Sequence, residues 1–201
     1  MPPPSSDRGG PQLAASRSLN ILVDQQSRLA SFDAFVDTAA ASITEACGAN
    51  LPIALLVADV DHFRKLTSTY GEHYASEVLR TIFDLARANL REGEAVSHPG
   101  GDELVALLRA SATAAREVAE RLCAAVRGHA FPQSDHAGPP RGTISIGIAT
   151  GPEHGSTYAA LHTAADPARV RLKAQGRDGA AVAPPPLQAS EPLHRPLDVD
   201  R

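Results

Sequence analysis

The sequence contains no tryptophan and only two cysteines, and aromatic residues make up 4% of its 201 positions. A small secreted domain held together by a disulfide framework needs more cysteines than this. Cys47 and Cys123 each fall within a helix-like apolar pattern. We therefore expect both to be reduced core residues of a protein from a reducing compartment.

The sequence also lacks a long hydrophobic run and an excess of positive charge. No apolar segment approaches the roughly 20 residues that span a bilayer, and the segment Met1–Ser6 has neither the basic nor the apolar region of a signal peptide. The formal net charge is -4, whereas nucleic-acid-binding domains usually present a basic surface. We expect a cytoplasmic protein that binds neither membranes nor nucleic acids.

Proline, serine and glycine dominate the two ends of the chain, where no hydrophobic periodicity is present. This composition predicts disordered tails over residues 1–18 and 184–201, the second being rich in proline. Between the tails, residues 19–183 are predicted to form a single domain. Its composition is ordinary for a globular protein, because 43% of the chain is apolar and 21% is charged.

Helix-like and strand-like patterns alternate through this predicted domain. Hydrophobic periodicity predicts helices over 32–46, 72–90, 112–126, 157–164 and 168–175, and strands over 53–58, 143–149 and 180–182. Gly128 is predicted to cap the third helix at its C-terminus, and residues 131–142 read as a loop. The order of elements predicts an α/β sandwich with a mixed central sheet flanked by helices.

Acidic residues follow a predicted strand and a predicted hairpin turn. Gly100-Gly101 separates two short apolar runs, which favours a tight turn with Asp102 and Glu103 at or just after its tip. Asp59 and Asp61 follow the apolar run 53–58. Carboxylates in these two places can meet around a hard divalent cation, which suggests phosphoryl-transfer chemistry. Two alternatives stay open: the glycines form only a structural turn, and the aspartates only cap a helix.

Three motifs in this order resemble the GGDEF domain of the diguanylate cyclase family. They are Asp59-Val60-Asp61-His62-Phe63-Arg64, then Gly100-Gly101-Asp102-Glu103-Leu104, and then the block from Ala165-Asp166 through Lys173 to Gly176-Arg177. The resemblance extends from about residue 24 to residue 179. It identifies the chain as a divergent, stand-alone member, and it implies a palm-like sandwich of the nucleotide-cyclase type with its signature on a β-hairpin.

The resemblance implies that two subunits each bind one GTP and join them into a cyclic dinucleotide such as c-di-GMP, so a homodimer is expected during catalysis. Carried over by position, the roles fall into three groups. Asp59, Val60 and Asp102 hold Mg²⁺ or Mn²⁺; Asp102 and Glu103 are catalytic; Phe63, Arg64, Lys173 and Arg177 bind the phosphates. Metal ions and cationic side chains suit phosphoryl transfer. The alternative for Lys173 and Arg177 is that they merely favour a helix C-terminus.

The chain departs from the family pattern where the base should bind. Thr67 and Ser76 stand in place of the Asn and Asp that contact guanine in the family. A hydroxyl both donates and accepts hydrogen bonds, so ATP is a second candidate substrate; alternatively, both residues only begin helices. Arg91 and Glu94 fall on the family's product-inhibition site, although they also read as an ordinary surface pair.

Two further departures concern hydrophobic or aromatic positions of the family. His98-Pro99 replaces an Arg and an aromatic residue before the signature, and Arg169-Val170 replaces Leu-Tyr.

The sequence therefore supports two hypotheses. One is an active nucleotidyl cyclase; the other is a degenerate, non-catalytic module that binds a nucleotide or cyclic dinucleotide and signals through a protein partner.

Overall fold

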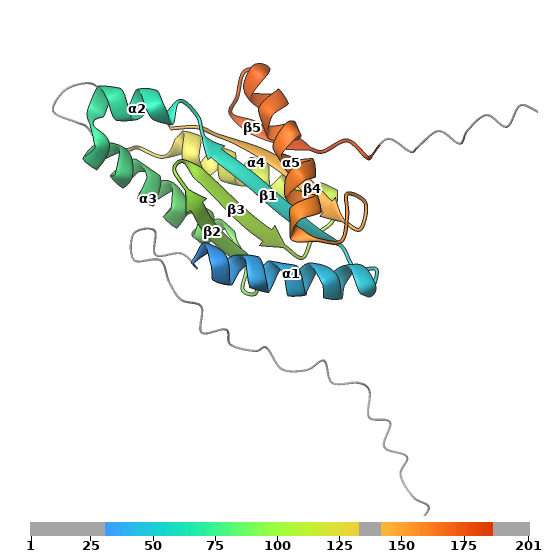
Figure 1. Cartoon of the computed structure of the whole chain (residues 1–201). Coiled ribbons are helices and arrows are strands. Elements are labelled where there is room, and N and C mark those ends of the chain that lie inside the picture. Colours follow the sequence, from blue (N-terminus) through green and yellow to red (C-terminus); the bar gives the residue numbers. More distant parts are fainter. Residues whose placement is uncertain (1–30, 133–141, 187–201) are drawn as a thin grey trace, which may run out of the picture.

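The structure, a computed structural model, describes residues 31–132 and 142–186. Its centre is a five-stranded mixed sheet in the order β2-β3-β1-β4-β5, in which β5 runs parallel to β4 and the other neighbours are antiparallel. The strands are β1 (Ile53–Val60), β2 (Ala95–Gly100), β3 (Glu103–Leu108), β4 (Ile144–Gly151) and β5 (Gly179–Val182). The predicted mixed sheet flanked by helices is confirmed (Figure 1).

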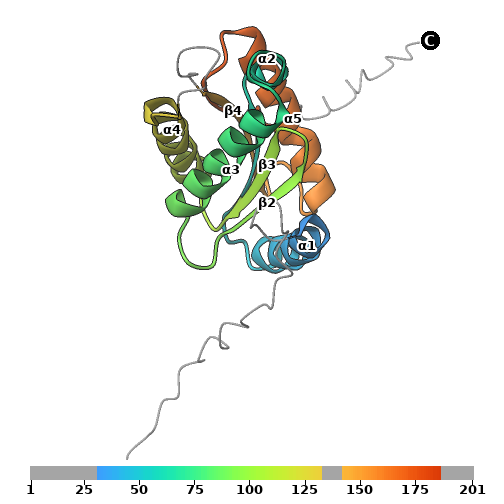
Figure 2. The same cartoon turned by 90° about the vertical axis from the view of Figure 1, so that its left-hand side faces the viewer.

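Helices cover both faces of the sheet. They are α1 (Phe32–Gly48), α2 (Phe63–Tyr70), α3 (Glu72–Asn89), α4 (Ala112–Gly128) and α5 (Tyr158–Ala174). One core lies between the sheet and α3 and α4, and the other lies between the sheet and α1 and α5 (Figure 2). None of the helices in the described ranges is long and apolar enough to cross a membrane.

Strand β1 contributes side chains to both cores. Leu56 and Val60 face the core under α3 and α4, whereas Leu55 and Val57 face the core under α1 and α5. Because side chains alternate along a strand, a strand buried on both faces reads as a continuous apolar run. This explains why the run Ile53–Ala58 contains no polar residue, and it places the end of β1 at the centre of one sheet edge.

Several predicted elements differ from the structure. The predicted helices 157–164 and 168–175 form the single helix α5, which continues through Pro167. Burial of Leu161, Ala165 and Ala168 against the sheet favours the continuous helix despite the lost N–H. Gly128 is the last residue of α4 rather than its cap, since His129 occupies the cap position.

Helix α2 was not predicted; it is only eight residues long and none of its side chains is fully buried, although Phe63 and Leu66 pack against the core. Part of the predicted loop 131–142 lies outside the described residues, which resume at Gly142. The predicted tail 1–18, and most of the predicted tail 184–201, also lie outside the described residues.

Candidate active site

The pairing of β1 with β3 gathers three carboxylates at one edge of the sheet. Asp59 lies opposite Glu103 in the ladder, and the Val60 N–H donates to the Asp102 carbonyl at 3.1 Å. The pair Gly100–Glu103 closes the hairpin, so Gly101 and Asp102 form its turn, one residue later than predicted. Gly100 and Gly101 have φ values of 140° and 63°, which glycine adopts without steric cost. The structure thus brings Asp59, Asp102 and Glu103 together.

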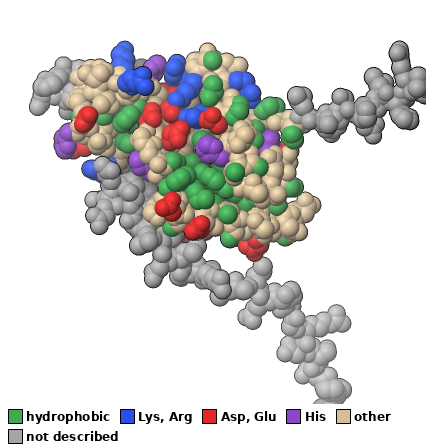
Figure 3. Space-filling model, viewed as in Figure 1, with side chains coloured by type: hydrophobic (Ala, Val, Ile, Leu, Met, Phe, Trp, Pro, Cys, Tyr) green, Lys and Arg blue, Asp and Glu red, His purple; other side chains and the backbone are tan. Residues whose placement is uncertain are grey.

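Two cationic side chains of α5 contact the buried Asp59. Arg169 donates from Nη1 to Asp59 Oδ2 at 2.6 Å, and Lys173 donates from Nζ to Asp59 Oδ1. Arg169 and Lys173 are four residues apart, so they lie on the same face of the helix. Figure 3 shows acidic side chains next to Lys and Arg side chains at this end of the molecule.

Asp102 lies beside these charges without a direct ion pair to them among the contacts of the described residues. Partial burial raises the pKa of its carboxyl above the usual value, and the nearby Asp59 charge raises it further. Its own backbone hydrogen bond and the charges of Lys173 and Arg169 act in the opposite direction. The carboxyl of Asp102 therefore holds a proton more readily than an exposed aspartate does.

Asp61 has a structural role that the sequence did not reveal. Its buried carboxylate accepts from Ser145 Oγ at 2.7 Å, from Thr143 Oγ1 at 2.8 Å and from the Asp178 N–H at 3.1 Å. The carboxylate therefore points toward β4 and the turn after α5. The alternative that Asp59 or Asp61 caps a helix is wrong, since α2 begins after His62 without a side-chain cap.

The largest pocket described at this edge has a volume of about 580 Å³; it is called the phosphate pocket below, after the role that the sequence predicts for its cationic residues. It is lined by Asp59, Val60, His62, Phe63, Arg64, Thr67, Asp102, Lys173 and Arg177. Its walls combine two carboxylates with three Lys or Arg side chains, drawn from β1, α2, the hairpin, α5 and the turn after α5. Glu103 is not part of this lining; its Oε1 lies 3.4 Å from Arg169 Nη2.

A neighbouring pocket of about 230 Å³ lies between α3 and the hairpin. It is called the base pocket below, after the role that the sequence predicts for Ser76. It is lined by Phe63, Ser76, Leu79, Arg80, Phe83, His98 and Gly101, so Phe63 is common to both pockets. Thr67 and Ser76, predicted to act together, line different pockets. Their hydroxyls donate to the carbonyls of Phe63 and Glu72 at 3.0 and 2.8 Å, which leaves both oxygens as acceptors for a ligand.

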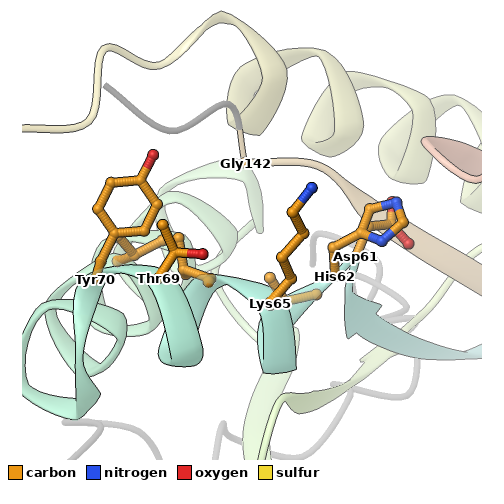
Figure 4. A pocket seen from close by; sticks show the side chains of 9 residues that line it. Asp61, His62, Lys65, Thr69, Tyr70 and Gly142 are labelled. Carbon is orange, nitrogen blue, oxygen red and sulfur yellow. The ribbon is translucent and has the colours of Figure 1, made fainter. Parts of the chain in front are cut away.

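A third pocket, of about 310 Å³, lies on the other side of α2 (Figure 4). Lys65 projects into it between Tyr70 and the Asp61–His62 pair. Asp61 lines this pocket, but its oxygens already accept the three hydrogen bonds described above. Among its described residues, the pocket therefore presents the cationic side chain of Lys65, whereas the carboxylate of Asp61 is already hydrogen-bonded.

The predicted product-inhibition residues form a local turn before β2. Glu94 Oε2 accepts the Arg91 backbone N–H at 2.8 Å, and the Glu94 N–H donates to the Arg91 carbonyl at 3.1 Å. The guanidinium of Arg91 does not enter these two bonds. The contacts explain the turn, and the role of Arg91 and Glu94 in product binding stays a prediction.

Comparison with known proteins identifies the chain. Residues 21–179 match the family model described as the diguanylate cyclase GGDEF domain. The chain belongs to the GGDEF family. The fold agrees, because the GGDEF domain of TpbB from Pseudomonas aeruginosa superposes with a TM-score of 0.75 at 28% identity, covering 81% of this chain and 95% of that one.

Two curated relatives of this GGDEF domain are named for different activities. The diguanylate cyclase DgcP of P. aeruginosa is 36% identical over 132 residues, which cover 65% of this chain and 19% of that protein. The cyclic di-GMP phosphodiesterase PdeR of Escherichia coli is 30% identical over 129 residues, which cover 64% and 19%. The chain spans less than a third of each of these relatives.

The GGDEF domain contains oxygen donors of the right type for a divalent cation, but cationic side chains of the protein already contact one of these carboxylates. Carboxylates such as Asp59 and Asp102 are the ligands that Mg²⁺ and Mn²⁺ prefer. Yet both oxygens of Asp59 already accept from Arg169 and Lys173. Within residues 31–132 and 142–186, no group of three or more His, Cys, Asp or Glu side chains is placed to hold a metal ion.

Two residues that line the pocket between α3 and the hairpin were not predicted as site residues, and the contacts of Arg169 were not predicted either. Arg80 lies one turn after Ser76 on α3, and the His98 ring lies 4.6 Å from Phe83 with Nε2 3.1 Å from the Gly101 carbonyl. His98 had been noticed only as a departure from the family motif. The spacing Ser76–Arg80 could have indicated a shared helix face.

Proposed function

We propose that the chain is a nucleotidyl cyclase that condenses two nucleoside triphosphates into a cyclic dinucleotide such as c-di-GMP. The observation that carries this proposal is the phosphate pocket, in which Arg64, Lys173 and Arg177 face the carboxylates of Asp59 and Asp102. Phosphoryl transfer depends on positioning and on charge stabilisation of the phosphates rather than on a protein nucleophile. Because each active site supplies one nucleotide, the active species is a homodimer.

The phosphates bind to α2 and to the end of α5. Phe63 and Arg64 are the first residues of α2, where backbone N–H groups have no partner within the helix and attract anions. Lys173 and Arg177 approach from α5 and the turn that follows it. Binding of the phosphates would give Lys173 a new anionic partner in addition to Asp59.

Asp59 and Asp102, together with the Val60 carbonyl, would hold Mg²⁺ or Mn²⁺, which supplies positive charge to the triphosphate when bound. The protein groups have a second task in the reaction. The 3′-hydroxyl of one nucleotide attacks the α-phosphorus of the other, pyrophosphate leaves, and a carboxylate accepts the hydroxyl proton. Glu103 is the candidate for this role, because it lies next to Asp102 in the hairpin and is not one of the groups that would hold the metal.

The base binds in the base pocket, where Ser76 offers a hydrogen-bond acceptor, while Thr67 offers a second acceptor from the adjoining phosphate pocket. Their hydroxyl protons are engaged by helix carbonyls. Acceptors suit the N1–H and amino group of guanine, but they also suit the amino group of adenine. GTP is therefore the first substrate and ATP the second. We place the reaction in the cytoplasm.

A second candidate function is a non-catalytic module that binds a nucleotide or cyclic dinucleotide and acts through a protein partner. The ion pairs of Asp59 with Arg169 and Lys173 favour it, because they engage the carboxylate that the metal requires. The similarity to PdeR is compatible with it as well, since that relative is named for a phosphodiesterase activity.

A product assay separates the two functions. The full chain, at concentrations that permit dimers, is incubated with Mg²⁺ or Mn²⁺ and GTP, ATP or both, and products are identified by mass spectrometry. The cyclase proposal predicts a cyclic dinucleotide with the wild-type chain and none with Asp102→Ala. No product in any mixture, with nucleotide binding retained, would leave the binding module.

A further inference from the structure

A buried arginine contacts the carboxylates of the proposed active site. Arg169 has a side chain that is 10% exposed, although arginine is rarely buried unless it is paired. Its guanidinium donates to Asp59 from Nη1 and to Asp166 from Nε, at 2.6 and 3.0 Å. Nη2 also lies 3.4 Å from Glu103 Oε1. One guanidinium therefore neutralises carboxylates from β1, β3 and α5.

The backbone of α5 fixes Arg169 in this position. A Cβ at Gly147 of β4 would lie 2.1 Å from the Ala165 carbonyl oxygen and 2.9 Å from the Arg169 nitrogen. Only a glycine at this point of β4 lets the helix approach so closely. This contact holds the backbone nitrogen of Arg169 against β4. From there the side chain reaches Asp59 on the neighbouring strand β1.

Asp59 consequently has a protein cation on each oxygen. Arg169 donates to Oδ2 of this carboxylate, and Lys173 donates to Oδ1. A divalent cation at this carboxylate would be repelled by two positive charges at contact distance, and burial weakens the solvent screening between them. Displacing Arg169 from Asp59 would also break one of the ion pairs of a buried guanidinium, which is unfavourable.

We propose that Arg169 is a resident counter-cation of Asp59 and competes with divalent cations for this carboxylate in the nucleotide-free protein. The proposal takes the role of Asp59 as a metal ligand from the proposed function. It adds that the affinity of this chain for the metal is set by an arginine that is not itself a metal ligand. The readout is metal binding, which does not depend on turnover.

The test measures Mn²⁺ binding to the nucleotide-free full chain by titration calorimetry and by electron paramagnetic resonance of free Mn²⁺. Arg169→Leu and Arg169→Gln should each bind Mn²⁺ at least about tenfold more tightly than the wild type, because one charge of repulsion is removed. Arg171→Leu is the matched control, since it removes the same charge from an exposed position of the same helix. Adding Asp59→Asn to Arg169→Gln should abolish the gain.

Wild-type affinity in a folded Arg169→Gln variant would overturn the proposal. Circular dichroism and thermal unfolding establish the fold. The glutamine variant keeps an N–H donor, so the test still stands if the leucine variant fails to fold. The wild type gives an independent test: micromolar Mn²⁺ binding that Asp59→Asn removes would also overturn the proposal. A gain in Mn²⁺ affinity without product in any variant would refute the cyclase function alone, and product without a gain would refute the role of Arg169 alone.

Discussion

The Asp61 carboxylate accepts the backbone N–H of Asp178 at 3.1 Å, although 117 residues separate the two in the sequence. Asp178 in turn accepts two hydrogen bonds from Arg127 of α4, at 2.6 and 3.0 Å. The end of β1, the turn after α5 and the end of α4 are thus joined through two carboxylates. Arg177, which lines the phosphate pocket, lies in this turn with a left-handed φ of 67°.

We expect Asp61→Ala to destabilise the fold and to weaken phosphate binding. Removal of the carboxylate leaves Ser145 and Thr143 with buried or half-buried hydroxyls and frees the Asp178 N–H, at a cost of about 1–3 kcal/mol for each buried group left unpaired. Urea unfolding measures the free energy, and titration with inorganic triphosphate measures binding. Arg127→Gln serves as the control, because it loosens Asp178 without touching Asp61; unchanged stability in Asp61→Ala would contradict the structural role.

Gly147→Ala should be strongly destabilising, whereas Gly128→Ala should not. A Cβ at Gly147 would overlap the Ala165 carbonyl, so α5 has to move away from β4, and overpacking of this kind typically costs about 1–3 kcal/mol. Gly128 ends α4 with nothing within 4 Å of its Cβ position, and alanine there favours the helix by up to about 1 kcal/mol. Thermal unfolding of both variants compares them; equal melting temperatures would show that α5 does not depend on Gly147.

Much of the fold follows from local patterns in the sequence, and the site follows from them only in part. The run Ile53–Ala58 predicted a strand buried on both faces, and the glycine pair predicted the hairpin that carries Asp102. The partners of Asp61 lie more than 80 residues away, and Asp59 lies 110 residues from Arg169, so no local spacing could indicate these contacts. Pro167 suggested a break between two helices, but burial of α5 against the sheet keeps the helix continuous. This is a tertiary effect, which hydrophobic periodicity along the sequence cannot predict.

The stability of the metal-free protein should depend on the ionisation of Asp102. Its pKa is raised in the folded state, so the contribution of this group to stability is fully present below its ordinary pKa of 3.8 and is lost as the pH rises through the folded value. Asp102→Asn should therefore be more stable than the wild type at pH 7, and the difference should shrink toward pH 3.8. Urea unfolding in EDTA across this range measures it; a variant less stable at pH 7 would contradict the sign.

Ser76→Asp should strengthen the preference for guanine over adenine. The hydroxyl of Ser76 is one acceptor in the base pocket, and a carboxylate there offers two acceptor oxygens to the N1–H and amino group of guanine, while it presents no donor to N1 of adenine. A charged hydrogen bond is worth about 1.5–3 kcal/mol, so the ratio of GTP to ATP affinity should rise roughly tenfold or more. Competition between GTP and ATP for a fluorescent nucleotide gives this ratio. Ser68→Asp is the control, because it adds the same charge at an exposed position of α2 outside the base pocket; an equal change in both variants would mean that overall charge, rather than contact with the base, sets the preference.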